Sequence, residues 1–176
     1  MHLSKILSIC MLVLAVSCDS TPPEGTTDEF VRQLFISNKE VFEELHLMIQ
    51  EDSKVKRVGD DVVGDDWFKT SGSTLNEALE SAGLSRERYD IYMKLLRCIG
   101  AYRVSCRASY AGATNDTIIG IHRWGIVPEG FTLDVIYTLE SIYDPFVEDT
   151  IEATRRDNTQ AYLPLGGCWY IRRVHD

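Results

Sequence analysis

The hydrophobic pattern of this chain changes period at Gly100, and this change constrains the fold more than any other feature. Before Gly100, apolar residues recur at helical spacing, whereas after it they alternate with polar residues, as in half-buried strands. Strands that follow one another without long helices between them favour an antiparallel sheet. The sequence therefore predicts an α+β domain, in which two or three N-terminal helices pack on one face of a four- to five-stranded antiparallel sheet.

The first predicted helix is long and amphipathic and covers residues 27–50. Thr26 and Glu29 form a capping box at its start. Apolar residues such as Leu34 and Leu45 then recur on one face, which is the face expected to meet the sheet.

Two further helices are predicted before the change of period. Thr74 and Glu77 form a second capping box, and Gly83 is placed to end the short helix that follows it. Ser85 is a good N-cap for a third helix, which runs to Gly100.

The second half of the chain carries the strand signals. Alternation marks the first three strands, and a Pro-Leu-Gly-Gly turn at 164–167 marks a final hairpin. The predicted strands cover residues 102–107, 119–122, 132–139, 161–163 and 168–174.

The first 17 residues have the parts of an export signal. Lys5 supplies a positive start, residues 6–16 are apolar, and Ser17 is a small residue before the cleavage point. The apolar stretch is shorter than the roughly 20 residues that a membrane-spanning helix needs. We therefore expect residues 1–17 to be a signal peptide that is removed.

The sequence LAVSC at residues 14–18 resembles the lipobox of bacterial lipoproteins, in which a cysteine receives a diacylglyceryl group and, after cleavage, a further acyl group such as palmitate. It departs from that pattern at Ala15, where Leu, Val or Ile is usual. The resemblance covers residues 1–18 only. It implies lipidation of Cys18 and a protein anchored in the bacterial cell envelope, facing the periplasm. Asp19 is similar to the signal that keeps such proteins on the inner membrane in enterobacteria.

An ordinary secreted protein cut near Ala15 or Ser17 is the alternative, but the next residues favour anchoring. Residues 19–26 are polar and rich in Pro, Ser and Thr, as expected of a tether. The lipidated cysteine and tether thus occupy 18–26, and residues 27–176 are long enough for a single globular domain.

The net charge of -9 narrows the choice of partners. A strongly acidic domain is repelled by nucleic acid and by anionic lipid, so binding to nucleic acid is not expected. The expected membrane contact is the lipid anchor at Cys18. A cationic or envelope protein remains a possible partner, and the alternative is that the excess acid only confers solubility.

Three cysteines belong to the predicted domain. An exported domain meets oxidising conditions, so one disulfide is plausible, and Cys106 with Cys168 is the expected pair because both fall in predicted strands. Cys98 would then be a free thiol. None of the three has the C-x-x-C spacing of a redox or zinc site.

The sequence contains no recognisable catalytic or cofactor motif. The acidic residues at 60, 61, 65 and 66 do not have calcium-loop spacing, no two histidines have zinc-site spacing, and no Gly-x-Ser-x-Gly is present. We therefore predict no metal site, no cofactor and no catalytic residue. A thiolate–imidazole pair of Cys106 with His122, on neighbouring strands, is a weak hypothesis.

One segment is a candidate binding surface. Asp65, Asp66, Trp67 and Phe68 place aromatic groups beside acidic ones in a predicted loop, which is a pattern found in protein-recognition patches. The alternative is that these aromatic residues, like others in the predicted loops, cover the edges of a small sheet.

Two function classes follow from these features. The first is a non-enzymatic envelope lipoprotein that binds or inhibits another protein, as an immunity-type module does. The second is a lipid-tethered hydrolase that acts on the cell wall or on exported substrates. Two converging carboxylates in a pocket, or Cys106 beside His122, would favour the hydrolase.

Overall fold

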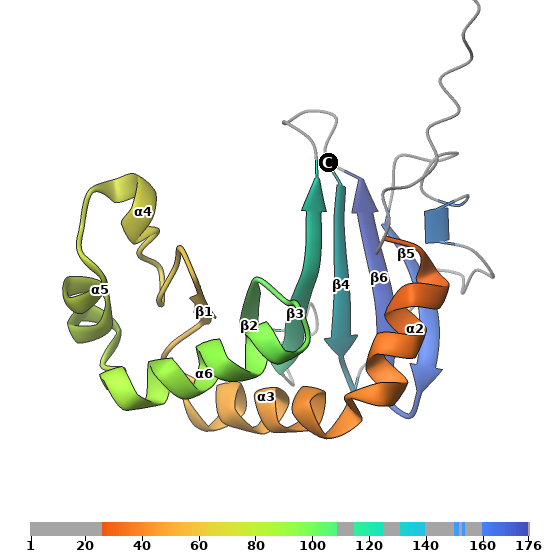
Figure 1. The fold of residues 1–176 in the computed structure, drawn as a ribbon, viewed down its shortest axis with the longest axis horizontal. Coiled ribbons are helices and arrows are strands. Elements are labelled where there is room, and N and C mark those ends of the chain that lie inside the picture. The colour runs from red at the N-terminus through yellow and green to blue at the C-terminus, as the bar shows by residue number, and fades with distance from the viewer. Residues whose placement is uncertain are drawn as a thin grey trace, which may run out of the picture.

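The computed structural model describes residues 26–108, 115–124, 131–139, 150–151, 153 and 160–175 (Figure 1). The predicted signal peptide, Cys18 and the tether as far as residue 25 lie outside this part of the chain. The helices are α2 (Asp28–Ser37), α3 (Lys39–Glu51), α4 (Phe68–Ser71), α5 (Leu75–Ala82) and α6 (Arg86–Cys98). The strands are β1 (Arg57–Gly59), β2 (Arg103–Ala108), β3 (Asn115–Trp124), β4 (Phe131–Tyr137), β5 (Gln160–Gly166) and β6 (Trp169–His175).

The predicted α+β class is confirmed. All strand pairs are antiparallel, and the sheet has six strands in the order β1-β2-β3-β4-β6-β5, where four or five were expected. The sequence missed β1, because a strand of three residues is too short to show alternation. Helices α2, α3 and α6 pack against the sheet, while α4 and α5 lie beyond β1 at one end of the molecule (Figure 1).

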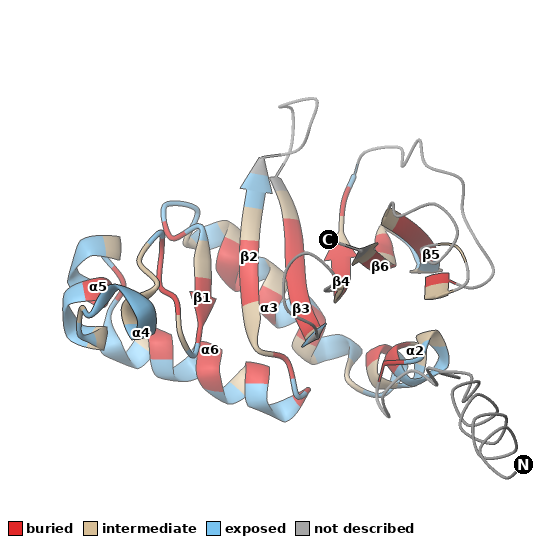
Figure 2. Ribbon diagram, turned by 90° about the horizontal axis from the view of Figure 1, so that it is seen from above, coloured by how far each residue is buried: buried red, intermediate tan, exposed pale blue. Residues whose placement is uncertain are grey.

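The register gives the two faces of the sheet different chemistry. One row of paired residues is aliphatic and buried against the helices, and the next row along the strands points to the opposite face. The aliphatic row is Val104, Ile119, Val135, Ile171 and Leu163. The next row is Arg103, Gly120, Asp134, Arg172 and Tyr162. Figure 2 shows how buried positions recur along β2 and β3.

The single helix predicted over 27–50 is wrong, because the chain forms two helices that meet at Asn38. The side chain of Asn38 donates to the Leu34 carbonyl (3.0 Å), and its backbone is non-helical. This break lets α2 pack on β5 and β6 while α3 packs on β2 and β3. Phe35 and Phe42 flank the bend, and both rings contact Trp169.

The capping signals for the other helices agree with the structure. Thr74 and Glu77 form the expected capping box of α5, and Gly83 ends that helix in the left-handed conformation. Ser85 caps α6 by accepting from the Arg88 backbone amide. Among the described residues, no helix is long and apolar enough to span a membrane.

The predicted disulfide between Cys106 and Cys168 is contradicted by the structure. Both residues are free thiols. Cys106 lies on β2, and Cys168 directly precedes β6, so β3 and β4 separate them. Three strand spacings of about 4.8 Å each place them about 14 Å apart, which is about twice the largest Cα–Cα distance that a disulfide spans.

A buried ionic network ties the start of the domain to its last strand. Arg173 on β6 is buried and donates to the Thr150 hydroxyl (3.0 Å), to the Thr26 carbonyl and to the Asp28 carboxylate (3.4 Å). The Thr150 amide also donates to Asp28 (2.7 Å). Because Asp28 lies in the first turn of α2, this network fixes that helix against β6.

Replacing Arg173 by leucine is expected to lower the free energy of unfolding by about 3 to 5 kcal/mol, because Asp28 would keep a largely buried charge without its cation. Urea unfolding followed by circular dichroism measures the change. Arg86→Leu is the matched control, since the ion pair that the structure describes for Arg86 is with Asp90 on an exposed helix face, and it should cost less than about 1 kcal/mol. An Arg173→Leu protein as stable as this control would contradict the role given to the network.

Candidate functional site

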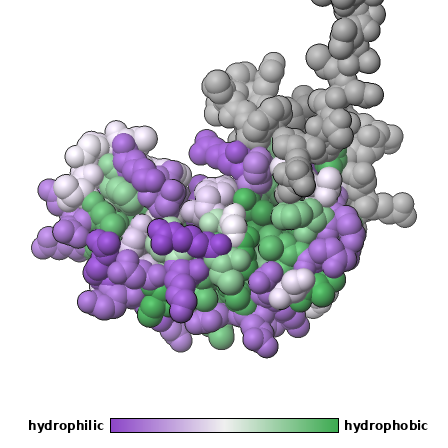
Figure 3. Space-filling model, in the orientation of Figure 1, coloured by the Kyte–Doolittle hydropathy of each residue, from purple (hydrophilic) through white to green (hydrophobic). Residues whose placement is uncertain are grey.

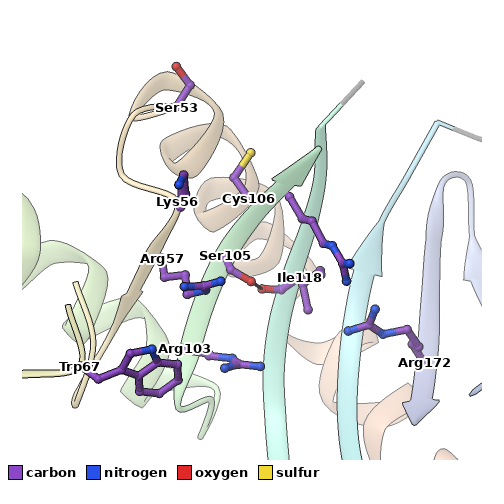
Figure 4. A pocket seen from close by; sticks show the side chains of 10 residues that line it. Ser53, Lys56, Arg57, Trp67, Arg103, Ser105, Cys106, Ile118 and Arg172 are labelled. Carbon is purple, nitrogen blue, oxygen red and sulfur yellow. Dashed lines mark hydrogen bonds between the residues drawn. The ribbon is translucent and has the colours of Figure 1, made fainter. Parts of the chain in front are cut away.

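A groove of about 690 Å³ lies on the face of the sheet opposite the aliphatic row (Figure 4). This volume is in the range of ligand sites in proteins. It is lined by Ser53, Lys56, Arg57, Trp67, Arg103, Ser105, Cys106, Arg107, Ile118 and Arg172. Figure 4 shows Arg57 and Arg103 extending from β1 and β2, and Arg172 extending toward them from β6. We call this site the basic groove.

The charge of the basic groove is opposite to that of the whole chain. Among the described residues, its lining includes five lysine and arginine residues and no carboxylate, whereas the chain has a net charge of -9. Figure 3 shows hydrophilic residues over much of the end that carries α4 and α5, with some hydrophobic residues among them and a larger hydrophobic area near the middle of the molecule. A local excess of cations in an acidic protein indicates a site for an anionic group.

Asp65 and Asp134 lie beside the groove and hold three of its cations in place. Asp65 accepts from Lys56 (2.8 Å) and from Arg57 (3.3 Å) at the exposed rim. Asp134 is fully buried, and one of its oxygens accepts two hydrogen bonds from Arg172 (3.2 and 2.6 Å). The ion pairs of Asp65 with Lys56 and Arg57, which we call the rim pairs, are exposed and weak enough for a ligand to replace Asp65. The buried pair of Arg172 with Asp134 is a fixed part of the sheet.

Arg103 on β2 lines the groove beside Trp67 (Figure 4). Within the described structure it has no carboxylate partner, and its Nε atom is buried without a hydrogen bond. Its guanidinium lies 5.2 Å from the centre of the Tyr102 ring. Tyr102 in turn covers Gly120, where a Cβ atom would come within 2.5 Å of that ring. Gly120 therefore makes room for the tyrosine that positions Arg103.

The predicted binding segment 65–68 is divided between different environments. Asp65 pairs with Lys56, and Asp66 accepts hydrogen bonds from two serine hydroxyls, those of residues 71 and 73. Trp67 lines the basic groove, and Phe68 packs against the hydrophobic core. The segment therefore does not present one acidic and aromatic face, and Trp67 is its member that reaches the groove.

A second cavity, of about 650 Å³, contains the carboxylates of Asp65, Asp66 and Glu80. Acid catalysis at neutral pH needs a carboxyl whose pKa is raised so that it keeps its proton. Here the hydrogen bond from Lys56 lowers the pKa of Asp65. The pKa of this carboxyl therefore changes in the direction opposite to that of a general acid.

A polar cluster lies between α3 and the sheet. The Thr117 hydroxyl is hydrogen-bonded to His46 Nδ1 (2.7 Å) and accepts from Gln50 (3.1 Å), which also contacts the Cys106 sulfur (3.7 Å). Burial raises the pKa of the Cys106 thiol and lowers the pKa of His46. Cys106 is thus held as a thiol, which is the unreactive form. The Tyr137 ring stacks on His46, with ring centres 4.0 Å apart, as in a packed core contact.

The hypothesis of a Cys106–His122 pair is wrong. Cys106 is registered against Thr117, and His122 lies five residues further along β3, opposite Leu133. At about 3.3 Å per residue, the backbone positions from which the two side chains project are some 16 Å apart along the strands. Among the residues that the structure describes, no group of three or more His, Cys, Asp and Glu side chains could hold a metal ion.

Comparison of the chain with protein-family models, with curated proteins and with solved structures found no match.

Sequence reasoning missed the basic groove, although one signal was present. Arg103, Ser105 and Arg107 alternate with apolar residues and so share the polar side of β2. Their role depends on Arg57 and Arg172, which lie far away in sequence and reach the same face through the strand order.

The raised pKa of Cys106 predicts slow alkylation. At pH 7, we expect iodoacetamide to modify Cys106 at least about tenfold more slowly than the exposed Cys98, because little of the Cys106 thiol is ionised. Peptide mass spectrometry over time measures both rates in one sample, with Cys98 as the internal reference. A rate at Cys106 above that at Cys98 would instead indicate an activated nucleophile.

Proposed function

We propose that this chain is a membrane-anchored envelope lipoprotein, held by lipid at Cys18, whose domain is a non-enzymatic binding module of the inhibitor or immunity type. The partner docks on the basic groove. The observation that carries the proposal is the set of arginine side chains on the sheet face opposite the helices, with Trp67 at its rim. Arginine and tryptophan are the residue types most enriched among those that dominate binding energy in protein interfaces.

The groove is suited to binding because its parts are held before a partner arrives. Arg172 is fixed by Asp134, and Arg103 is supported by the Tyr102 ring. Both arginines project from the hydrogen-bonded sheet and not from a loop. Side chains that are already ordered lose less entropy on binding, which favours affinity.

The alternative, a lipid-tethered hydrolase, has less support. A cysteine nucleophile would need a lowered pKa, and burial raises the pKa of Cys106. A general acid would need a raised pKa, and the pKa of Asp65 is lowered by Lys56. The pKa shifts of Cys106 and Asp65 are therefore opposite to those that the two catalytic roles require.

The partner is better described as anionic than as cationic. The expectation of a cationic partner came from the net charge of the whole chain. The groove, however, presents cations at the place where a partner can be enclosed. Short-range complementarity at the contact determines specificity, whereas net charge acts mainly on solubility and approach.

The proposed location rests on residues 1–19 and not on the domain. The LAVSC sequence supports the anchor at Cys18, and Asp19 supports the inner membrane, with the domain in the periplasm. A lipid anchor would hold the groove close to the membrane, where an incoming or resident envelope protein can be bound.

Replacing Cys18 by alanine is expected to abolish incorporation of labelled palmitate and to move the protein out of the membrane fraction, because the thioether can no longer form. Metabolic labelling and fractionation of a bacterial host measure both effects. Cys10→Ala is the matched control, since it changes a leader cysteine outside the lipobox-like sequence, and it should keep the label. A mature wild-type chain without acyl groups would contradict the anchor.

Replacing Trp67 by alanine is expected to weaken partner binding by about 30-fold or more, as truncation of a tryptophan that dominates the binding energy of an interface does. The measurement is recovery of membrane proteins by the tagged full chain, quantified by mass spectrometry. Phe30→Ala is the matched control, because Phe30 is an exposed aromatic residue on α2, and it should leave recovery unchanged. Equal recovery with both variants would place binding elsewhere, and no specific recovery by the wild type would contradict the binding function.

A further inference from the structure

We propose that the basic groove binds an extended acidic segment of the partner protein, about six residues long, that crosses the strands from Trp67 toward Arg172. This inference rests on the proposed binding function and names the chemistry of the partner's contact. It is carried by the distribution of cations in the groove, by the apolar side chains between them and by the exposure of the rim pairs.

The cations are spread along a line and not gathered around one point. Arg57 is on β1, Arg103 is on the neighbouring β2, and Arg172 is on β6, which follows β3 and β4 in the sheet. Four strand spacings of about 4.8 Å separate β1 from β6, or about 19 Å. An extended peptide covers that distance with about six residues, and its alternate side chains can all face the groove.

Arg57 and Arg103 provide the strongest expected contacts with carboxylates. A guanidinium can donate two parallel hydrogen bonds to one carboxylate, which a lysine ammonium cannot do. The contact between Arg57 and Asp65 is long (3.3 Å) and exposed, so a ligand carboxylate can replace Asp65 there. Arg103 needs no such exchange, because none of the described carboxylates forms an ion pair with it.

The apolar part of the groove favours a peptide over a simple anion. Trp67 stands at one end, and Ile118 lies in the floor beside Ser105. Ile118 belongs to a small apolar cluster with Ile136 and Tyr162 on this face of the sheet. Apolar and aromatic side chains between the carboxylates of a peptide could pack on these groups, whereas phosphate could not.

The fixed negative charges also argue against a dense polyanion. Asp65 and Asp134 adjoin the groove, and the chain has a net charge of -9. A nucleic acid or an anionic lipid surface would bring many closely spaced charges against this field. A short segment with a few carboxylates meets the groove cations while leaving most of the acidic surface at a distance.

Fluorescence anisotropy with the purified full chain in non-ionic detergent tests the inference. The probe is a fluorescein-labelled peptide, Glu-Phe-Glu-Asp-Phe-Glu, and its matched control is Gln-Phe-Gln-Asn-Phe-Gln with the same label. We expect the acidic peptide to bind at least about tenfold more tightly, and its binding to weaken as salt is raised. Inorganic phosphate in the same buffer and, in a separate assay after detergent removal, phosphatidylglycerol vesicles serve as competitors and should not displace it at matched charge concentration.

The variants identify the site. Arg103→Gln should weaken binding of the acidic peptide about tenfold, and Arg103→Lys should restore part of the loss, because it keeps the charge but not the paired donors. Arg97→Gln on the exposed face of α6 is the control and should have no effect. Melting curves by circular dichroism establish that each variant is folded before its affinity is compared.

Three outcomes would overturn the inference. They are equal binding of both peptides, binding that does not depend on Arg103, and displacement by phosphate or vesicles at matched charge. If any of these three outcomes is found while a Trp67-dependent partner is still recovered from membranes, the acidic segment is rejected and the binding function is retained. If the wild-type chain recovers no specific partner either, both proposals are rejected.

Discussion

The basic groove, on the face of the sheet opposite the helices, depends on the neutralisation of the Asp134 carboxylate. Asp134 is fully buried in the middle of β4. Both of the hydrogen bonds described for the Oδ2 atom of Asp134 are donated by Arg172 on β6. A buried carboxylate without a cation would cost several kcal/mol and would repel any anion above it. Because Arg172 on the neighbouring strand compensates the charge of Asp134, the electrostatic field in the groove is determined by Arg103 and by the cations at the β1 end.

The same one-residue alternation produces both the core and the groove. The aliphatic row through Val104 and Ile119 faces the helices, and the adjacent row through Arg103 and Gly120 faces away. A shift of one residue in the register would bury the arginine row and expose the aliphatic one, so core packing fixes the groove as well. Gly120 is necessary to this arrangement because a side chain there would displace the Tyr102 ring.

The sequence predicted the features that local physics determines. Helix caps at Thr74 and Ser85 and the alternation after Gly100 need only neighbouring residues, and the structure agrees with them. The break at Asn38 was missed because hydrophobic periodicity continues through it, and because the packing of Phe35 and Phe42 on Trp169 joins residues that are far apart in sequence. The basic groove was missed for a related reason. Its cations come from strands whose order no local pattern reveals, and of the predicted segment 65–68 only Trp67 reaches it.

The opposite charges of the groove and of the whole chain fit together in a tethered protein. At physiological ionic strength, exposed charges are screened beyond about 8 Å, so the groove attracts mainly a ligand that is already close. The acidic remainder of the domain is repelled by anionic lipid, and this repulsion would keep the groove from lying on the membrane to which the proposed anchor ties it. An anchor at Cys18 and an excess of negative charge would therefore act together: the first brings the domain near envelope partners, and the second keeps its cationic site available to them.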